Sequence, residues 1–367
     1  ETEPAPRRGA LGDALGLVPL GTSPTKKEPT KARVVKLSQL RKFLECPLQG
    51  SATFALGMRG DDDDDVIAMT EEPLQSPHIS RVSALREIFV RAASEVPTLA
   101  DVEAVFARVQ QESWDKRVAQ ARAPAAVLGE VERAREFQAV KIWLKILGKN
   151  REQHFGTRFE RVVLGAPEDA TLPALVLPPI RIELKDGPVD VVGSTELMSR
   201  GATRLGIYPS FPRWGTKKQD RLRALLDHLV ATIALGSMAK YELFILAVNA
   251  EKKPSSDPVK LAAISPEYAR QYLKDLVEDL LDGSFDYLFP FDSAVIDVID
   301  DFKSLEDAVE AVRDQFDAPG GKPASAYGPI RDAASRPTPP QDVADRIIRR
   351  RFLRFYELSP QMRRSKE

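Results

Sequence analysis

The 367-residue sequence is 43% hydrophobic and 29% charged, a balance typical of a folded protein with one large domain or two smaller ones. Its 53 Lys and Arg residues nearly cancel its 54 Asp and Glu residues, so the net charge of -1 excludes a general attraction to nucleic acid and leaves only local basic patches. The single cysteine, Cys46, excludes an internal disulfide and a cysteine-ligated zinc or iron–sulfur centre built by this chain alone, and it indicates a reducing compartment, the cytoplasm.

The N-terminal segment, residues 1–32, contains five prolines and few aromatic residues, so we expect a disordered linker. Residues 1–6 lack the basic and apolar regions of a signal peptide, and no run of apolar residues is long enough to span a membrane. Because the sequence has no initiator Met, we expect it to be a fragment of a longer chain.

Residues 33–155 are predicted to form a helical segment. A capping serine and a terminating proline bound a short helix over Gln39–Glu45, and a second short helix is expected over Leu48–Leu56. The consecutive carboxylates of Asp61–Asp65 repel one another and lack the spacing of a calcium loop, so a solvated loop is favoured over a cation site. Apolar residues at helical spacing predict three longer helices, over 80–93, 101–121 and 129–149.

The pattern of apolar and polar residues changes at about residue 156, and residues 156–316 are predicted to form an α/β core. Alternating apolar residues, with turns marked by Asp186-Gly187 and Ser199-Arg200-Gly201, indicate strands. A later apolar run indicates a buried strand over Tyr241–Asn249. Two amphipathic helices, over Gln219–Leu235 and Pro266–Asp282, surround that strand. Residues 317–340 are predicted to be a Pro/Gly-rich loop, and residues 341–367 a basic C-terminal helix and tail. The earlier strands are expected at Arg158–Val163, Ile180–Leu184, Val189–Met198 and Thr203–Ile207.

Two separated segments of the sequence carry linked motifs. The first is Ser38-Gln-Leu-Arg-Lys-Phe-Leu-Glu-Cys46-Pro47, continuing to Phe54-Ala-Leu-Gly57. The second is Gly193-Ser-Thr-Glu196-Leu-Met followed by Leu205-Gly-Ile207-Tyr208-Pro209-Ser210 and the helix opened by Gln219. Together they resemble the RecB-like nuclease domains. The first segment is similar to the opening helix pair of those domains, and at the second segment active members have Gly-x-x-Asp, then Asp-Tyr-Lys-Ser, then Gln on the next helix.

Three further features narrow the resemblance within that superfamily: Leu40-Arg-Lys-Phe43-Leu-Glu-Cys-Pro47 with Glu72-Pro73, Leu225-Leu-Asp-His228-Leu229, and the late Leu288-Phe-Pro-Phe291. They resemble the C-terminal region of RecC-type gamma subunits of exodeoxyribonuclease V. The resemblance covers roughly residues 34–295. It implies an α/β fold of the restriction-endonuclease-like, PD-(D/E)XK type: a mixed sheet flanked by helices, with a helical insertion or subdomain.

The resemblance also implies partners and a role. It implies a non-catalytic scaffold that binds DNA, both double-strand ends and single strands, and contacts RecB-like and RecD-like helicase subunits in double-strand break repair and recombination. This chain would need no cofactor of its own, because ATP and Mg²⁺ would belong to the partner subunits. The sequence has no phosphate-binding Gly-x-x-x-x-Gly-Lys-Ser/Thr element, and no membrane contact is expected.

The motif positions argue against catalysis in this chain. Glu196 falls on the first acid position, but Ile207 replaces the second acid and Pro209 replaces the lysine. An alkyl side chain cannot bind a hard cation such as Mg²⁺, and proline offers neither a charge nor a donor. Glu196 is therefore a vestigial position, and it is interpreted as a solvent-facing strand residue. Displaced acids on the preceding hairpin, Glu183, Asp186 and Asp190, keep open the alternative of an active Mg²⁺-dependent exonuclease.

The loop after the altered strand is the candidate DNA contact. Its cations and its aromatic ring suit phosphate contact and base stacking; they are Arg213, Trp214, Lys217, Lys218 and Arg221. A solvated helix start explains the same residues equally well, which keeps open the alternative of a protein-interaction module without DNA contact.

The C-terminal helix and His228 are two further features of the sequence. In the C-terminal helix, arginines alternate with Phe352 and Phe355, a pattern that favours docking on a partner subunit over backbone contact. His228 lies beside an apolar helix face and is expected to be a core histidine.

Overall fold

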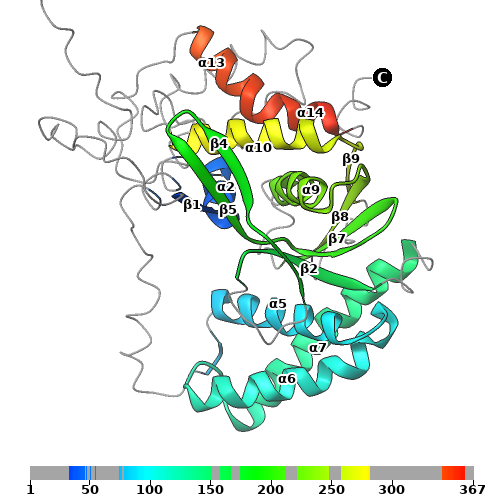
Figure 1. Ribbon diagram of the computed structural model, residues 1–367. Coiled ribbons are helices and arrows are strands. Elements are labelled where there is room, and N and C mark those ends of the chain that lie inside the picture. The colour runs from blue at the N-terminus through cyan, green and yellow to red at the C-terminus, as the bar shows by residue number, and fades with distance from the viewer. Residues whose placement is uncertain are drawn as a thin grey trace, which may run out of the picture.

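The computed structural model describes residues 33–45, 47, 50, 54, 74–76, 78–150, 158–166, 174–210, 221–247, 258–281 and 341–359. Helices cover both faces of a curled mixed sheet of nine strands (Figure 1). The predicted linker, the Asp run, most of the second short helix and the loop over 317–340 lie outside these residues. None of the helices in the described ranges is both long and apolar enough to cross a lipid bilayer.

The sheet has the strand order β1-β5-β2-β6-β7-β8-β9, with β3 paired to β2 and β4 paired to β5. The β4–β5 hairpin turns through Lys185 and Asp186, and Gly187, which begins β5, has a positive φ of 108° that explains the glycine of the Asp186-Gly187 signal. The strands are β1 (Arg33–Lys36), β2 (Phe159–Leu164), β3 (Ala174–Leu177), β4 (Ile180–Leu184), β5 (Gly187–Ser194), β6 (Leu197–Ser199), β7 (Thr203–Ser210), β8 (Lys240–Ala247) and β9 (Val259–Leu261).

One helical layer packs on the face of the sheet that carries the larger apolar cluster. The first helix, α2, buries Leu40 and Phe43 in this cluster, and α9 contributes almost every apolar side chain along its length. The helices of this layer are α2 (Leu37–Glu45), α9 (Arg221–Leu235), α10 (Pro266–Leu281), α13 (Gln341–Ile348), the π-helical turn η5 (Arg349–Leu353) and α14 (Arg354–Leu358).

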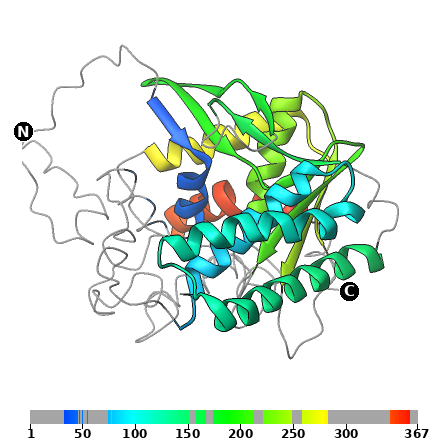
Figure 2. The same ribbon diagram turned by 90° about the horizontal axis from the view of Figure 1, so that it is seen from below.

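A second helical layer covers the opposite face (Figures 1 and 2). Alternation along β7 divides its side chains between the layers: Leu205 and Ile207 belong to the second cluster, and Tyr208 belongs to the first. The helices of the second layer are α5 (His78–Glu95), the 3₁₀ turn η1 (Leu99–Asp101), α6 (Val102–Ala119) and α7 (Ala126–Asn150). The expected mixed α/β fold is confirmed. The helices predicted over 80–93, 101–121 and 129–149 correspond to α5, α6 and α7 of this layer, whereas residues 33–45 of the predicted helical segment form β1 and α2, and α2 packs in the other layer.

The C-terminal helix packs on its own chain. Phe352 and Phe355 are fully buried in the larger cluster, and the hydroxyl of Tyr272 on α10 donates to the Arg351 carbonyl at 2.7 Å. The arginines pair with acids of α10: Arg350 Nη2 lies 2.6 Å from Glu278, Arg351 Nε 2.7 Å from Asp279, and Arg354 Nη1 2.5 Å from Asp275. The interpretation that these aromatic residues need a partner subunit is therefore wrong, because α10 and the core of the same chain bury them.

Candidate functional site

A β-bulge positions Glu196. Ser194 faces Val163 and Met198 faces Glu160, so the two residues 161–162 of β2 oppose the three residues 195–197 of the other chain segment. The Thr195 hydroxyl oxygen accepts from the Val162 amide at 3.1 Å and fixes this irregular register. Bulges of this kind redirect a side chain. Here Glu196 is only 4% exposed, so the interpretation of Glu196 as a solvent-facing strand residue is wrong.

The two segments that carry the sequence resemblance meet beside this bulge. Gly193 has a φ of 121°, and a Cβ on it would lie 3.4 Å from the backbone nitrogen of Leu37. Leu37 is the first residue of α2, the opening helix of the first segment. The glycine therefore provides both the backbone conformation and the close approach that bring α2 to the end of β5.

Two guanidinium groups from opposite helical layers hold the Glu196 carboxylate. Arg223, in the first turn of α9, lies 2.6 Å from Glu196 Oε1 through its Nη1 atom. Arg86, on α5, approaches both carboxylate oxygens through its Nη2 atom, at 3.4 and 3.5 Å. Both pairs are largely removed from water, with side-chain exposures of 17% for Arg223 and 27% for Arg86.

The Tyr208 ring supports the same two arginines. The Arg86 guanidinium carbon lies 4.4 Å from the ring centroid and that of Arg223 lies 4.2 Å from it, both within cation–π range. The neighbouring Ile207 is fully buried in the apolar cluster on the other face of the sheet. At the positions that the resemblance assigns to a second acid and a lysine, β7 carries Ile207 and Pro209, and Tyr208 between them contacts two cations that come from α5 and α9.

Asp227 is a member of the site that the sequence did not predict. It is fully buried on α9, one turn after Arg223, and its Oδ2 accepts from the Glu196 amide at 3.1 Å. Arg41 on α2 and the Tyr241 hydroxyl on β8 approach it at 3.5 Å each. The available signal was an acid inside the apolar stretch of a helix, four residues after a basic residue.

The two acids titrate in opposite directions. Burial acts to raise the pKa of Glu196, but the attraction of Arg223, Arg86, Arg41 and Arg161 outweighs it and lowers the pKa to about 2. Burial raises the pKa of Asp227 to about 7; the charge of Glu196 adds to the rise, and Arg41 opposes it. Glu196 is therefore an anion at neutral pH, whereas Asp227 is close to its midpoint.

These residues do not fit a divalent cation. Among the residues that the structure describes, no three His, Cys, Asp or Glu side chains converge on a point. On the β4–β5 hairpin, Asp190 pairs with Arg181 at 3.0 Å and Glu183 is exposed, so neither joins Glu196. No catalytic step through Mg²⁺ follows from this geometry.

The predicted DNA-contact residues are only partly described. Arg221 is half-buried at the first position of α9, two residues before Arg223. Arg213, Trp214, Lys217 and Lys218 lie outside the described residues. Their role in DNA contact remains a prediction.

His228 is the core histidine that the sequence predicts. It is fully buried, and its Nε2 atom lies 2.9 Å from the Ala262 carbonyl oxygen. Burial lowers its pKa to about 4, so the ring is neutral at physiological pH.

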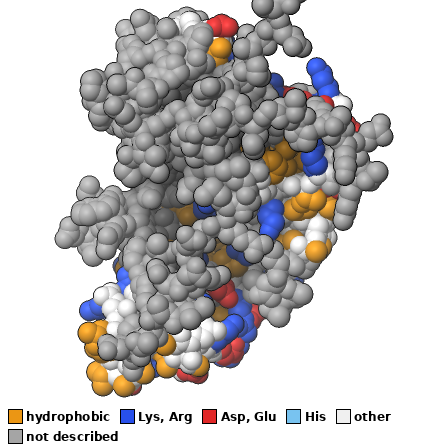
Figure 3. All heavy atoms as spheres, turned by 90° about the vertical axis from the view of Figure 1, so that its left-hand side faces the viewer, with side chains coloured by type: hydrophobic (Ala, Val, Ile, Leu, Met, Phe, Trp, Pro, Cys, Tyr) orange, Lys and Arg blue, Asp and Glu red, His pale blue; other side chains and the backbone are white. Residues whose placement is uncertain are grey.

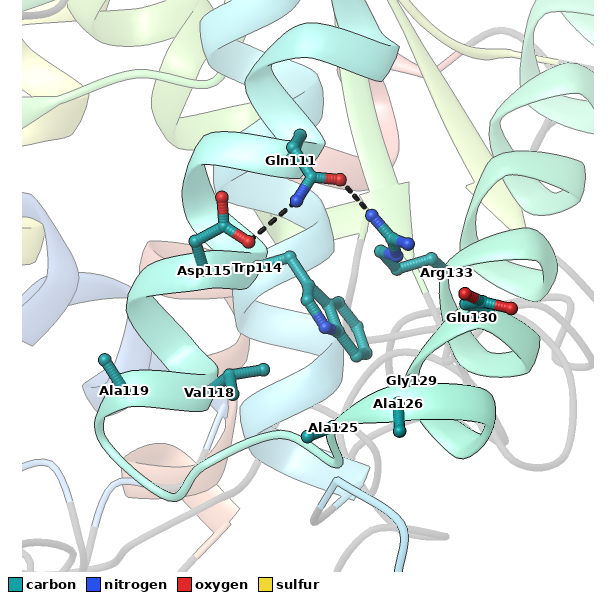
Figure 4. Close-up of a pocket in the computed structure, with 10 residues that line it drawn as sticks. All are labelled: Gln111, Trp114, Asp115, Val118, Ala119, Ala125, Ala126, Gly129, Glu130 and Arg133. Atoms are coloured by element: carbon teal, nitrogen blue, oxygen red, sulfur yellow. Dashed lines mark hydrogen bonds between the residues drawn. The ribbon is translucent and has the colours of Figure 1, made fainter.

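A groove of about 400 Å³ lies between α6 and α7 (Figure 4). Hydrophobic side chains are also exposed at this lower end of the molecule (Figure 3), with Val127 on α7 70% exposed. The groove contains neither Glu196 nor any predicted DNA-contact residue, so it is separate from the candidate site. Its lining is Gln111, Trp114, Asp115, Val118, Ala119, Ala125, Ala126, Gly129, Glu130 and Arg133.

Comparison with protein families identifies the class to which this fold and altered site belong. The family model of the RecC C-terminal domain matches residues 32–294, which include α2, the bulge, β7, α9 and α10. The chain belongs to this family, the C-terminal region of RecC-type gamma subunits, as the sequence motifs predicted. No curated protein matches the chain in a direct sequence comparison.

Proposed function

We propose that the chain is a non-catalytic, DNA-binding scaffold domain of a RecBCD-type helicase–nuclease, exodeoxyribonuclease V, acting in double-strand break repair and recombination. Family membership supports the assembly, with RecB-like and RecD-like subunits as partners. We further propose that the fold is a degenerate PD-(D/E)XK nuclease. In support, the two motif segments meet at the bulge, and Leu197 of β6 faces Ile207 of β7 as a direct strand neighbour.

The pairing of Glu196 with Arg86 and Arg223 is the observation that carries the non-catalytic role. A nuclease of this type needs a carboxylate free to bind Mg²⁺, which stabilises charge at the phosphorus. Here two guanidiniums neutralise the one remaining motif acid, and Ile207 supplies no ligand. The ATP and Mg²⁺ of the assembly would then act in the partner subunits.

A nuclease assay on the whole chain tests this role. Single-stranded and double-stranded DNA are incubated with Mg²⁺ or Mn²⁺, and cleavage is compared with a protein-free control and with the Glu196→Gln variant. We expect all three to be equal. Cleavage that requires the metal and disappears in Glu196→Gln would instead establish an active nuclease with displaced acids.

A second measurement tests the DNA-binding part of the proposal. Binding of labelled single-stranded and forked DNA is followed from low to high salt. Phosphate contacts predict that the logarithm of affinity falls linearly with the logarithm of salt concentration. A protein-interaction module without DNA contact would show no binding even at low salt.

A further inference from the structure

Among the residues that the structure describes, positive charge exceeds negative charge around Glu196. The described acids that act on this group of charges are Glu196 itself, Asp227, and Glu45, which acts on Arg223. Asp227 is only partly ionised near neutral pH, because burial raises its pKa to about 7. The guanidinium groups that act on Glu196 are Arg223, Arg86, Arg41 and Arg161. A group of cations with this excess favours an anion as an additional partner.

The hydrogen-bonding capacity of the two arginines exceeds what Glu196 accepts. A guanidinium offers five N–H donors, whereas one carboxylate offers about four acceptor positions for both groups together. Arg223 reaches Glu196 through Nη1 and Arg86 reaches it through Nη2. The Nε atoms of both are buried and have no hydrogen-bond partner among the described residues. The two guanidiniums therefore have more N–H donors than the Glu196 carboxylate accepts, which leaves capacity for a further acceptor on their Nη groups.

The position of the pair in the fold also suits an anion. β7 and β8 are parallel, and Tyr208, which contacts both guanidiniums, lies near the carboxyl end of β7. Ligands of α/β sheets bind outside the carboxyl ends of parallel strands. Arg223 is in the first turn of α9, where the helix dipole adds positive potential. Arg86 and Arg223 retain exposures of 27% and 17%, so part of each side chain reaches solvent.

We propose that Arg86 and Arg223 receive one phosphodiester group of a DNA strand at the altered nuclease centre. This inference rests on the proposed function and names the residues that would serve it. Guanidinium–phosphate hydrogen bonds are charge-assisted and directional. Glu196 holds the two arginines in position without DNA and competes with the phosphate when DNA arrives. Since phosphate contacts fix register and orientation, the altered centre positions the strand without cutting it.

Binding of a single-stranded oligothymidylate to the full 367-residue chain tests the proposal. The probe is about 15 nucleotides long, within the range of known single-strand sites, and binding is followed by fluorescence anisotropy from about 0.05 to 1 M salt. Losing one single-strand phosphate contact lowers the salt slope by about 0.7, which corresponds to about five-fold weaker binding at 0.1 M salt if the curves converge at 1 M. We expect this result for Arg86→Gln.

Three further variants sharpen the test. Arg108→Gln is the matched control, because Arg108 is an exposed arginine of the same helical layer that pairs with Glu95 and Glu112. It should bind like the unaltered chain. Arg86→Lys keeps the charge and should keep the salt slope. Glu196→Gln removes the competing carboxylate and should bind the oligonucleotide more tightly, which a purely structural ion pair does not predict.

The outcomes separate this inference from the proposed function. If the unaltered chain binds DNA and Arg86→Gln keeps the same affinity and salt slope, the phosphate site is wrong while the DNA-binding role stands. If the unaltered chain fails to bind at low salt, both are wrong. Thermal unfolding by circular dichroism confirms that each variant is folded. If Arg86→Gln is not folded, weaker binding by a folded Glu196→Gln variant would overturn the proposal.

Discussion

Replacing Glu196 by Gln should remove a specific part of the acid sensitivity of this fold. Arginines hold the pKa of Glu196 at about 2, below the ordinary value of 4.5, even though burial acts in the opposite direction. A group with a lowered folded-state pKa stabilises the fold fully above its unfolded value, and that stability is lost as the pH falls through the folded value. At about 1.4 kcal/mol per pH unit, the difference between 4.5 and about 2 corresponds to roughly 3 kcal/mol in the free energy of unfolding.

The assay is urea unfolding of the chain with Glu196 and of Glu196→Gln at several pH values between about 2.5 and 5.5. Because the charge of Glu196 helps to raise the pKa of Asp227, Glu196→Gln would also change the titration of Asp227. Both proteins therefore carry Asp227→Asn, so that the difference between them reports on Glu196. That difference should grow with pH and reach its plateau near pH 5. Glu183→Gln, which removes an exposed carboxyl on β4, is the control and should show no such growth. A difference for Glu196→Gln that is constant over the interval would refute the assigned ion pairs.

Three more perturbations follow from the same structure. Ile207→Ala should lower the free energy of unfolding by about 2–5 kcal/mol, because the side chain is fully buried between the sheet and the second helical layer. As a control, Val176→Ala at a half-exposed edge position should change this free energy by less than about 1 kcal/mol. Phe355→Ala should cost about 3–5 kcal/mol in urea unfolding, and an unchanged midpoint would show that the C-terminal helix is not part of the core. Asp227→Asn should be stabilised relative to the unaltered chain as pH rises from about 4 to 7, because a raised folded-state pKa costs stability over that window; parallel pH profiles would contradict the assigned burial of this acid.

Local signals in the sequence predicted the elements they control. The Asp-Gly turn predicted the β4–β5 hairpin, and the apolar spacing from Leu222 to Ile233 predicted the buried face of α9. Both depend on neighbours within a few residues, so periodicity and turn chemistry were sufficient. The short strand β1 was missed, because it forms only by parallel pairing with β5, more than 150 residues later in the chain.

The sequence predicted one residue of the candidate site, Glu196, but not the residues that surround it. The motif located Glu196, but burial of that carboxylate depends on a one-residue bulge opposite β2, which no local pattern announces. Arg86 is 110 residues away in sequence and reaches Glu196 only because the second helical layer packs across the sheet. The same is true of the C-terminal helix. Its arginines suggested a binding surface in the sequence, but the acids that pair with them lie on α10 of the same chain.

The ion pairs of Glu196 with Arg86 and Arg223 also limit which substitutions could create a metal site. Removing one partner of a buried ion pair typically costs about 3–5 kcal/mol, because it leaves an uncompensated charge. An acid introduced in place of Ile207 would lie in an apolar layer and leave both arginines on Glu196. A single substitution is therefore not expected to create a metal site here.

A crystal structure of the chain grown with Mn²⁺ tests most directly whether arginines or a metal ion bind the Glu196 carboxylate. Anomalous scattering locates every bound manganese ion in such a crystal. We predict no manganese at Glu196 and guanidinium nitrogens of Arg86 and Arg223 in contact with its oxygens. Manganese bound to that carboxylate, with the arginines displaced, would contradict the account.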